Sequence, residues 1–125
     1  MKFKNMFSPI QIGPMTVKNR FVVPPMGNNF ANSDGTWSDE SVAYYGERAK
    51  GQFGLITIEA TVVHKGAKGG PKKPCLYDDN SIESLKKITD ACHAEGAKVS
   101  IQLQNAGPEG NAKTVSYTHL TLPTT

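Results

Sequence analysis

The sequence lacks the features that mark membrane, secreted and metal-binding proteins. No apolar run approaches the ~18 residues of a membrane span, and the start, MKFKNMFSP, has no continuous apolar segment of a signal peptide. Cys75 and Cys92 are far apart, so without a secretion signal we expect reduced thiols in a cytoplasmic protein. His64, His93 and His119 have no metal-site spacing. We expect neither membrane association nor a metal site in this chain.

Charge and nucleotide-binding motifs are also sparse. The 125 residues carry a net charge of +3, with 38% hydrophobic and 20% charged residues, which is typical of a globular domain. The one basic stretch, residues 65–73 (KGAKGGPKK), has no interleaved aromatic residues and no G-x-x-x-x-G-K-[ST] phosphate loop. We expect a solvated loop there, with contact to an anionic substrate or cofactor as the alternative, and no nucleic-acid partner.

Apolar periodicity predicts a hairpin followed by alternating strands and helices. Residues 7–19 alternate around Gly13-Pro14, as in a hairpin. Strand-like runs occupy residues 20–26, 55–63 and 98–105. Two helices are predicted between a serine N-cap and a terminal glycine, at Ser38–Gly51 and Ser81–Gly96. The second should place four residues along one face, Ile82, Leu85, Ile88 and Cys92.

Strands separated by helices of this length form right-handed parallel βαβ units. Two α/β architectures fit, a TIM (β/α)₈ barrel and an open doubly wound sheet. An open sheet usually has a glycine-rich turn after its first strand, whereas this turn has only Gly27, and no G-x-G-x-x-G occurs. The pattern favours an N-terminal hairpin and about three of the eight βα units of a barrel, which needs ~250 residues when complete.

Barrel active sites lie at the C-terminal ends of the strands, which selects residues 24–27, 59–61 and 102–105. Gly27, after two prolines, predicts a rigid turn with exposed backbone against which a flat ring could stack, or a turn that only ends the strand. Glu59 is either the base of a lyase or aldolase or a partner for a nearby donor.

The third strand alternates apolar and polar residues over residues 99–104 (VSIQLQ). In a barrel the apolar set packs outward against helices, so Gln102 should face the lumen. An amide there offers two donors and one acceptor, which suits a heterocycle such as a flavin pyrimidine. The alternative is that Gln102 bonds a neighbouring strand end.

Three stretches closely resemble the Old Yellow Enzyme family of NAD(P)H:flavin oxidoreductases. They occur in the same order as in that family and with similar spacing. They are FSPIQIGPMTVKNRFVVPPMG, YYGERAKGQFGLITIEAT and AKVSIQLQNAG, within residues 5–113. The resemblance implies an FMN-binding barrel that passes hydride from NAD(P)H through the flavin to an activated C=C bond of a small molecule. It implies that Ala60 contacts the flavin through its backbone and that Gln102 hydrogen-bonds the pyrimidine. The first flavin-contacting turn would be Pro24, Pro25, Met26 and Gly27.

The sequence also departs from this family. Gly27 stands where many members carry Thr or Cys, whose side chain tunes the flavin. Where many members have the motif HAGR after the third strand, this chain has NAGP at residues 105–108. Residues 28–29 lack the aromatic residue that some members place there. The motif PPMGNNFAN resembles that of a branch of the family with longer chains. This longer branch carries a 4Fe-4S cluster and includes dienoyl-CoA reductases and bile-acid enone reductases.

The family's anion-binding pair, proton-donor tyrosine, flavin-phosphate arginines and cluster cysteines all follow the third strand. The resemblance therefore implies no catalytic residue in this chain, which we expect to be inactive alone. Residues 1–114 are interpreted as a partial FMN-binding barrel. Residues 115–125 (VSYTHLTLPTT) do not resemble the family's continuation, and we expect them to be foreign to the fold. A non-flavin lyase and a non-catalytic binding fragment are the competing hypotheses.

Overall fold

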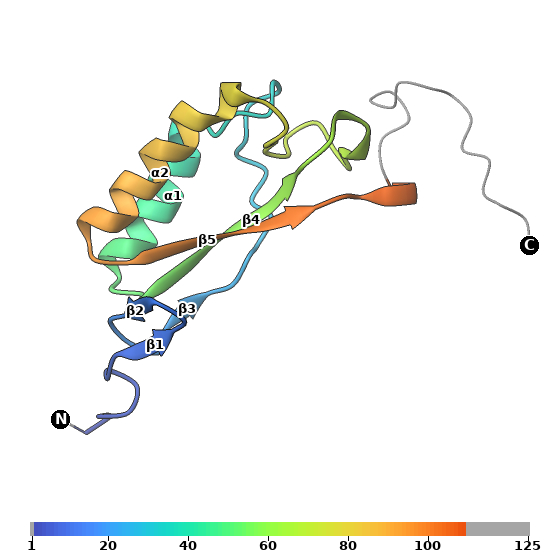
Figure 1. Cartoon of the computed structure of the whole chain (residues 1–125). Coiled ribbons are helices and arrows are strands. Elements are labelled where there is room, and N and C mark those ends of the chain that lie inside the picture. Colours follow the sequence, from blue (N-terminus) through green and yellow to red (C-terminus); the bar gives the residue numbers. More distant parts are fainter. Residues whose placement is uncertain (1, 110–125) are drawn as a thin grey trace, which may run out of the picture.

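The computed structural model describes residues 2–109, which form a hairpin and a three-stranded parallel sheet with two helices (Figure 1). The expected foreign tail lies outside these residues. The hairpin strands are β1 (Ile10–Ile12) and β2 (Met15–Val17). The sheet strands are β3 (Val22–Val23), β4 (Leu55–Val62) and β5 (Lys98–Gln104). The helices are α1 (Asp39–Lys50) and α2 (Ile82–Ala94).

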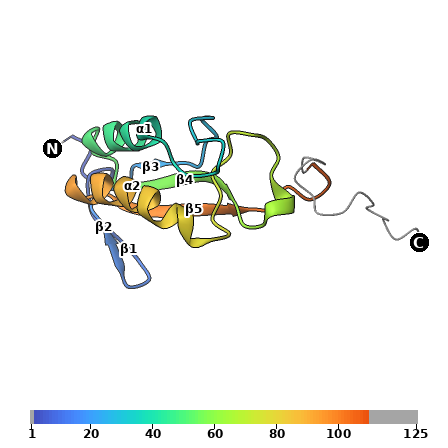
Figure 2. The ribbon, with the colours of Figure 1, turned by 90° about the horizontal axis from the view of Figure 1, so that it is seen from above.

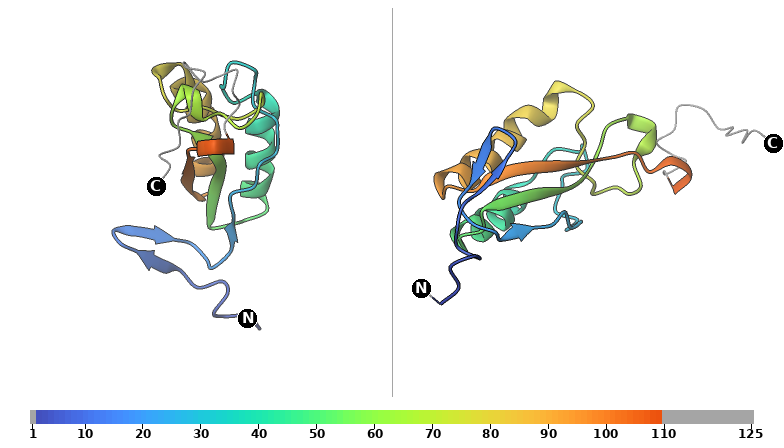
Figure 3. Two further views of the ribbon diagram at one scale, coloured as in Figure 1. Left: turned by 90° about the vertical axis from the view of Figure 1, so that its right-hand side faces the viewer. Right: turned by 60° about the horizontal axis from the view of Figure 1, so that its bottom comes forward.

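Both helices cover the same face of the sheet. The strand order, β3-β4-β5, follows the chain, and both neighbouring pairs are parallel. Figure 2 shows α1 and α2 side by side over the strands, and Figure 3 shows the other face without a helix. Right-handed crossovers between strands in chain order put both helices on one face, as in a barrel segment and in each half of a doubly wound sheet. The structure has the arrangement of a barrel segment, with two complete βα units and a third strand.

The predicted hairpin is present and lies at the N-terminal end of the sheet (Figure 1). Gly13 makes its turn with a φ of 55°. Lys18, just after β2, donates from Nζ to the carbonyl of Glu95 at 2.6 Å, and Asn19 donates from Nδ2 to the carbonyl of Gln52 at 2.7 Å. These bonds attach the hairpin to the ends of both helices. The opposite end of the sheet is left to the loops that follow the strands.

The first predicted strand is shorter than expected, while the other two agree with prediction to within one residue. Of residues 20–26 only Val22 and Val23 join the ladder. Pro24 and Pro25 have no N–H to donate, so pairing stops before them. The chain then runs into the next loop with exposed backbone.

The first helix is capped as predicted. The Ser38 side chain accepts a hydrogen bond from the N–H of Ser41 at 3.2 Å, and Gly51 ends the helix.

The cap predicted for the second helix was wrong. Ser81 has helical backbone angles, and its hydroxyl donates to the carbonyl of Cys75 at 2.6 Å instead of capping α2. Asp78 takes the capping role, because its side chain accepts from the N–H of Asn80 at the head of a 3-10 turn that leads into α2. Ile82 is 56% exposed and leaves the predicted apolar face, whose other members pack inward.

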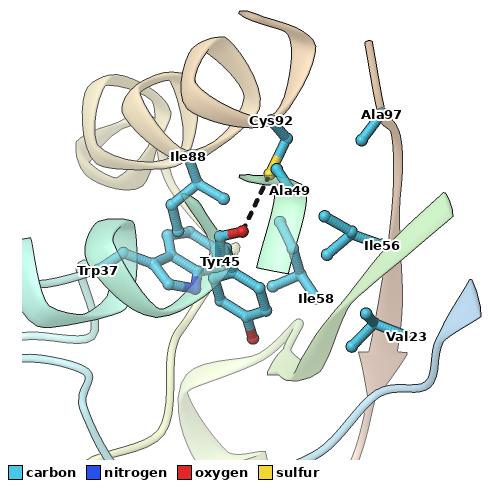
Figure 4. Packing of buried hydrophobic residues seen from close by; sticks show 9 residues of the cluster. All are labelled: Val23, Trp37, Tyr45, Ala49, Ile56, Ile58, Ile88, Cys92 and Ala97. Atoms are coloured by element: carbon cyan, nitrogen blue, oxygen red, sulfur yellow. Dashed lines mark hydrogen bonds between the residues drawn. The ribbon is translucent and has the colours of Figure 1, made fainter. Parts of the chain in front are cut away.

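The core lies between the helices and the sheet (Figure 4). Its buried members are Val23, Trp37, Tyr45, Ala49, Ile56, Ile58, Ile88, Cys92 and Ala97. Both cysteines of the chain are buried free thiols, and burial raises the pKa of the Cys92 thiol to about 11. No helix within residues 2–109 is long and apolar enough to cross a membrane.

The sheet face opposite the helices is open. On it or at its edges, Val22 is 48% exposed and Leu103 60% exposed. Within residues 2–109, β3 and β5 each pair on one side only. Unpaired edges with apolar side chains favour association with other chains, so these edges and this face need further structure to cover them.

We therefore expect the 125-residue chain by itself to be marginally stable. Circular dichroism should show a broad thermal transition, and 1-anilinonaphthalene-8-sulfonate should bind with enhanced fluorescence, because much apolar surface is uncovered. A sharp transition with equal calorimetric and van't Hoff enthalpies, together with no dye binding, would contradict this expectation.

Candidate functional site

Three segments predicted to carry function meet at the C-terminal end of the sheet. The turn of residues 24–27 follows β3, Ala60 lies near the end of β4, and Gln102 lies near the end of β5. Two local features bring these segments together, a bulge in β4 and a hydrogen bond from the turn to Glu59.

The bulge sets Ala60 opposite Gln102. Ile58 pairs with Ile101, and the next pair along the ladder is Thr61 with Leu103. Two residues of β4, Glu59 and Ala60, therefore face the single residue Gln102 of β5. Bulges are rare between parallel strands and are over-represented beside active sites, where they re-aim side chains.

The extra residue also changes the face on which Ala60 lies. In an unbroken strand, Ala60 would share the helix-facing side with Ile56 and Ile58. The bulge instead turns Ala60 toward the open face, the side on which the Thr57 and Ser100 hydroxyl oxygens lie 2.8 Å apart. Sequence reasoning missed the bulge. Its signal was the loss of strict alternation at Glu59, a charged residue inside an apolar run.

Gln102 lies on the open face as predicted. Val99 and Ile101, its neighbours of opposite parity, pack against the core. Gln102 is exposed, and its amide has no hydrogen-bond partner among residues 2–109. The alternative in which Gln102 bonds a neighbouring strand end is therefore not realised in this part of the chain. Its two donors and one acceptor are free for another group.

The turn after β3 presents unpaired backbone. Pro24 and Pro25 have no N–H. Within the part of the chain that the structure describes, the peptide groups of Met26 and Gly27 have no hydrogen-bond partner, and both residues are exposed. Free peptide groups in an exposed turn can contact a ring held against them.

Glu59 fastens this turn to β4. Its side chain is fully buried, and its Oε2 accepts a hydrogen bond from the N–H of Asn28 at 3.1 Å. Its own N–H donates to the hydroxyl of Tyr45 at 3.0 Å, which ties the bulge to α1. Burial raises the pKa of the Glu59 carboxyl, while the Asn28 N–H and the Lys73 charge act in the opposite direction. A carboxylate with no exposed surface cannot reach a substrate, so this geometry does not favour the lyase base.

Two buried polar atoms beside this bond are unsatisfied. Glu59 Oε1 and Asn28 Nδ2 have no hydrogen-bond partner among the described residues. Such atoms cost free energy unless another group meets them. The cluster under the turn is thus a polar site inside an otherwise packed end of the sheet.

The basic stretch 65–73 is less solvated than predicted. Ala67 is 3% exposed and Lys68 9% exposed, and Lys68 donates from Nζ to the carbonyl of Ser33 at 3.2 Å. The loop folds over the strand ends because it supplies backbone partners there. Sequence reasoning missed this role, since glycine- and lysine-rich segments usually read as solvent-facing.

The chain was also compared with known proteins. Residues 5–121 match the model of the NADH:flavin oxidoreductase / NADH oxidase family. A solved 2-naphthoyl-CoA reductase, in complex with 2-naphthoyl-CoA, is 34% identical with a TM-score of 0.84. The old yellow enzyme from Trypanosoma cruzi is 34% identical with a TM-score of 0.82. The old yellow enzyme from Pichia sp. AKU4542 is 36% identical with a TM-score of 0.76.

These likenesses cover most of this chain and a small part of each relative. The match covers 89% of this chain and 17% of the 2-naphthoyl-CoA reductase chain. It covers 91% of this chain and 30% of the Trypanosoma cruzi enzyme. The chain therefore spans less than a third of the length of these relatives. Experiments that need a whole barrel can use a chimera in which residues 5–109 replace the matching part of the Trypanosoma cruzi enzyme, here called the completed barrel.

Substituting Glu59→Gln in the completed barrel should change how stability depends on pH. A raised pKa in the folded state means that the unfolded chain loses the proton first, so stability falls as pH rises from about 4.5, the ordinary value, through the folded pKa. Glutamine does not ionise, so the variant should gain in free energy of unfolding relative to the parent over this window. Urea unfolding between pH 4 and pH 8 measures the difference.

The matched control is Glu83→Gln, on the exposed surface of α2. We expect its pH profile to run parallel to that of the parent. Parallel profiles for Glu59→Gln as well would contradict the buried, raised-pKa carboxyl.

Proposed function

We propose that this chain, which belongs to the NADH:flavin oxidoreductase / NADH oxidase family, supplies the first part of the FMN site of an ene-reductase. The observation that carries the proposal is the bulge that sets Ala60 opposite Gln102, beside the turn at Gly27. The reaction proposed is hydride transfer from NAD(P)H, by way of the flavin, to the activated C=C bond of an enone or enoyl thioester.

The residues at this end of the sheet fit the pyrimidine edge of a flavin. Gln102 offers a free amide, with donors and an acceptor on one side chain. Ala60 offers backbone at an interrupted ladder, and the 24–27 turn offers unpaired peptide groups. A ring with alternating donors and acceptors would satisfy these groups together. Pro24 and Pro25 stiffen the turn, so less conformational entropy is lost on binding.

When bound, FMN supplies the hydride-transfer chemistry, and the protein supplies binding, orientation and electrostatics. This chain would orient the ring and shield one edge of it from water. We assign no catalytic residue to it, and we place the donors that activate the substrate carbonyl in the later barrel units.

An acyl-CoA thioester is the substrate class we favour. The solved 2-naphthoyl-CoA reductase is in complex with 2-naphthoyl-CoA. The motif PPMGNNFAN also resembles that of the longer branch of the family. That relative is also long, since this chain covers 17% of it. Membership of this branch would add a 4Fe-4S cluster outside the present residues. Within residues 2–109, no group of three or more metal-binding side chains is close enough to hold a metal ion.

FMN titration of the completed barrel tests the proposal. We expect a yellow protein that binds FMN with one-to-one stoichiometry, while the 125-residue chain alone binds weakly, because most of the site's walls are missing. Flavin fluorescence quenching and the visible spectrum measure both. A completed barrel that folds cooperatively yet binds no FMN would refute the proposed function.

Removing the amide of Gln102 should weaken binding. Gln102→Leu keeps the volume but leaves flavin polar groups unpaired, at a cost of about 1–3 kcal/mol, or roughly 5-fold to 150-fold in Kd. Gln11→Leu, in β1 of the hairpin at the opposite end of the sheet (Figure 1), is the control and should bind nearly as the parent does. Equal affinity in both variants would exclude Gln102 from the site.

A further inference from the structure

The ammonium of Lys73 occupies the space that a side chain at residue 27 would fill. A Cβ built on Gly27 would lie 3.0 Å from Lys73 Nζ and 3.9 Å from Glu59 Oε2. A Cβ contact of 3.0 Å is tighter than most side-chain contacts, so an alanine here would shift the flexible end of the lysine by a few tenths of an ångström. Without a side chain at residue 27, the ammonium lies directly against the turn.

The backbone around Lys73 is held in place. The N–H of Val62 donates to the carbonyl of Pro74 at 2.9 Å, and the N–H of Leu76 donates to the carbonyl of Val62 at 2.7 Å. The N–H of Cys75 also donates to the carbonyl of Gly35 at 2.8 Å. These bonds pair the segment after Lys73 with the end of β4 and with the loop that follows β3. Lys73 is therefore carried to the turn by a fixed segment.

Charge explains why this lysine rests here. Glu59 lies buried beside Gly27, near the same Cβ position, and the charge of Lys73 lowers the pKa of that carboxyl against the effect of burial. The neighbouring basic residues are placed differently, since Lys68 is bonded to the Ser33 carbonyl and Lys72 is exposed. Of Lys68, Lys72 and Lys73, it is Lys73 whose ammonium lies against the turn.

We propose that Lys73 is a positioning residue that sets a positive charge at the cofactor turn and thereby favours the reduced form of the bound flavin. The inference rests on the proposed function, because the turn must contact the flavin for the charge to act. Reduced flavin carries more negative charge than oxidised flavin at neutral pH. A half-buried cation beside the turn stabilises that added charge, since the attraction grows as the local dielectric constant falls.

The test measures the midpoint potential of FMN bound to the completed barrel and to four variants. Lys73→Gln removes the charge and should lower the preference for reduced over oxidised FMN about tenfold, which for a two-electron couple is about 30 mV. Lys73→Arg keeps the charge and should retain most of the potential. Lys72→Gln removes an exposed neighbouring charge and should leave the potential unchanged. Gly27→Ala should lower the potential by much less than Lys73→Gln does, because its Cβ shifts the flexible ammonium by only a few tenths of an ångström and keeps the charge.

The outcomes separate this inference from the proposed function. FMN binding with equal potentials in the parent and Lys73→Gln overturns the role of Lys73 and leaves the proposed function standing. Equal falls for Lys73→Gln and Lys72→Gln also overturn it, because the effect would then be one of net charge. A folded parent that binds no FMN overturns the proposed function and this inference with it. If Lys73→Gln does not fold, Lys73→Met decides, because it removes the charge and keeps the apolar stem of the side chain.

Discussion

The candidate site depends on one irregularity, the extra residue that β4 carries between Ile58 and Thr61. Without it Ala60 would face the helices, and Glu59 would stand directly in the ladder with β5. With it, Glu59 is buried and holds the Asn28 N–H, while Ala60 comes to lie opposite Gln102. A regular strand stabilises itself through its ladder and leaves no free groups. The bulge interrupts the ladder and so sets Ala60 beside the free amide of Gln102.

The apolar residues that stabilise the fold and the residues of the candidate site lie on opposite faces of the same sheet. The face that packs against α1 and α2 is closed by apolar residues (Figure 4). Tyr45 links this face to the bulge, because its hydroxyl accepts the N–H of Glu59. The other face exposes hydroxyl and amide side chains and some apolar ones. This division explains why a few strands can already define the site's geometry. It also explains why they cannot enclose a ligand, since enclosure needs the strands that would stand across the lumen.

Buried charge is the costly part of the arrangement. The Glu59 carboxyl is removed from water, one of its oxygens has no partner among residues 2–109, and burial raises its pKa. Two groups offset this cost, a backbone N–H in the turn and the charge of Lys73, whose ammonium lies close to Gly27.

Local physics made much of the fold predictable. Period-two and helical apolar patterns determined the hairpin, β4, β5, both helices and the face on which Gln102 lies, because these depend on near neighbours in the sequence. The prolines located the end of β3 but not its brevity. The Ser81 cap failed because Asp78 offered an earlier start and the Cys75 carbonyl took the serine hydroxyl. The bulge, the burial of Glu59 and the approach of Lys73 to Gly27 required the tertiary structure, since each arises where segments distant in sequence compete for the same space and the same hydrogen-bond partners.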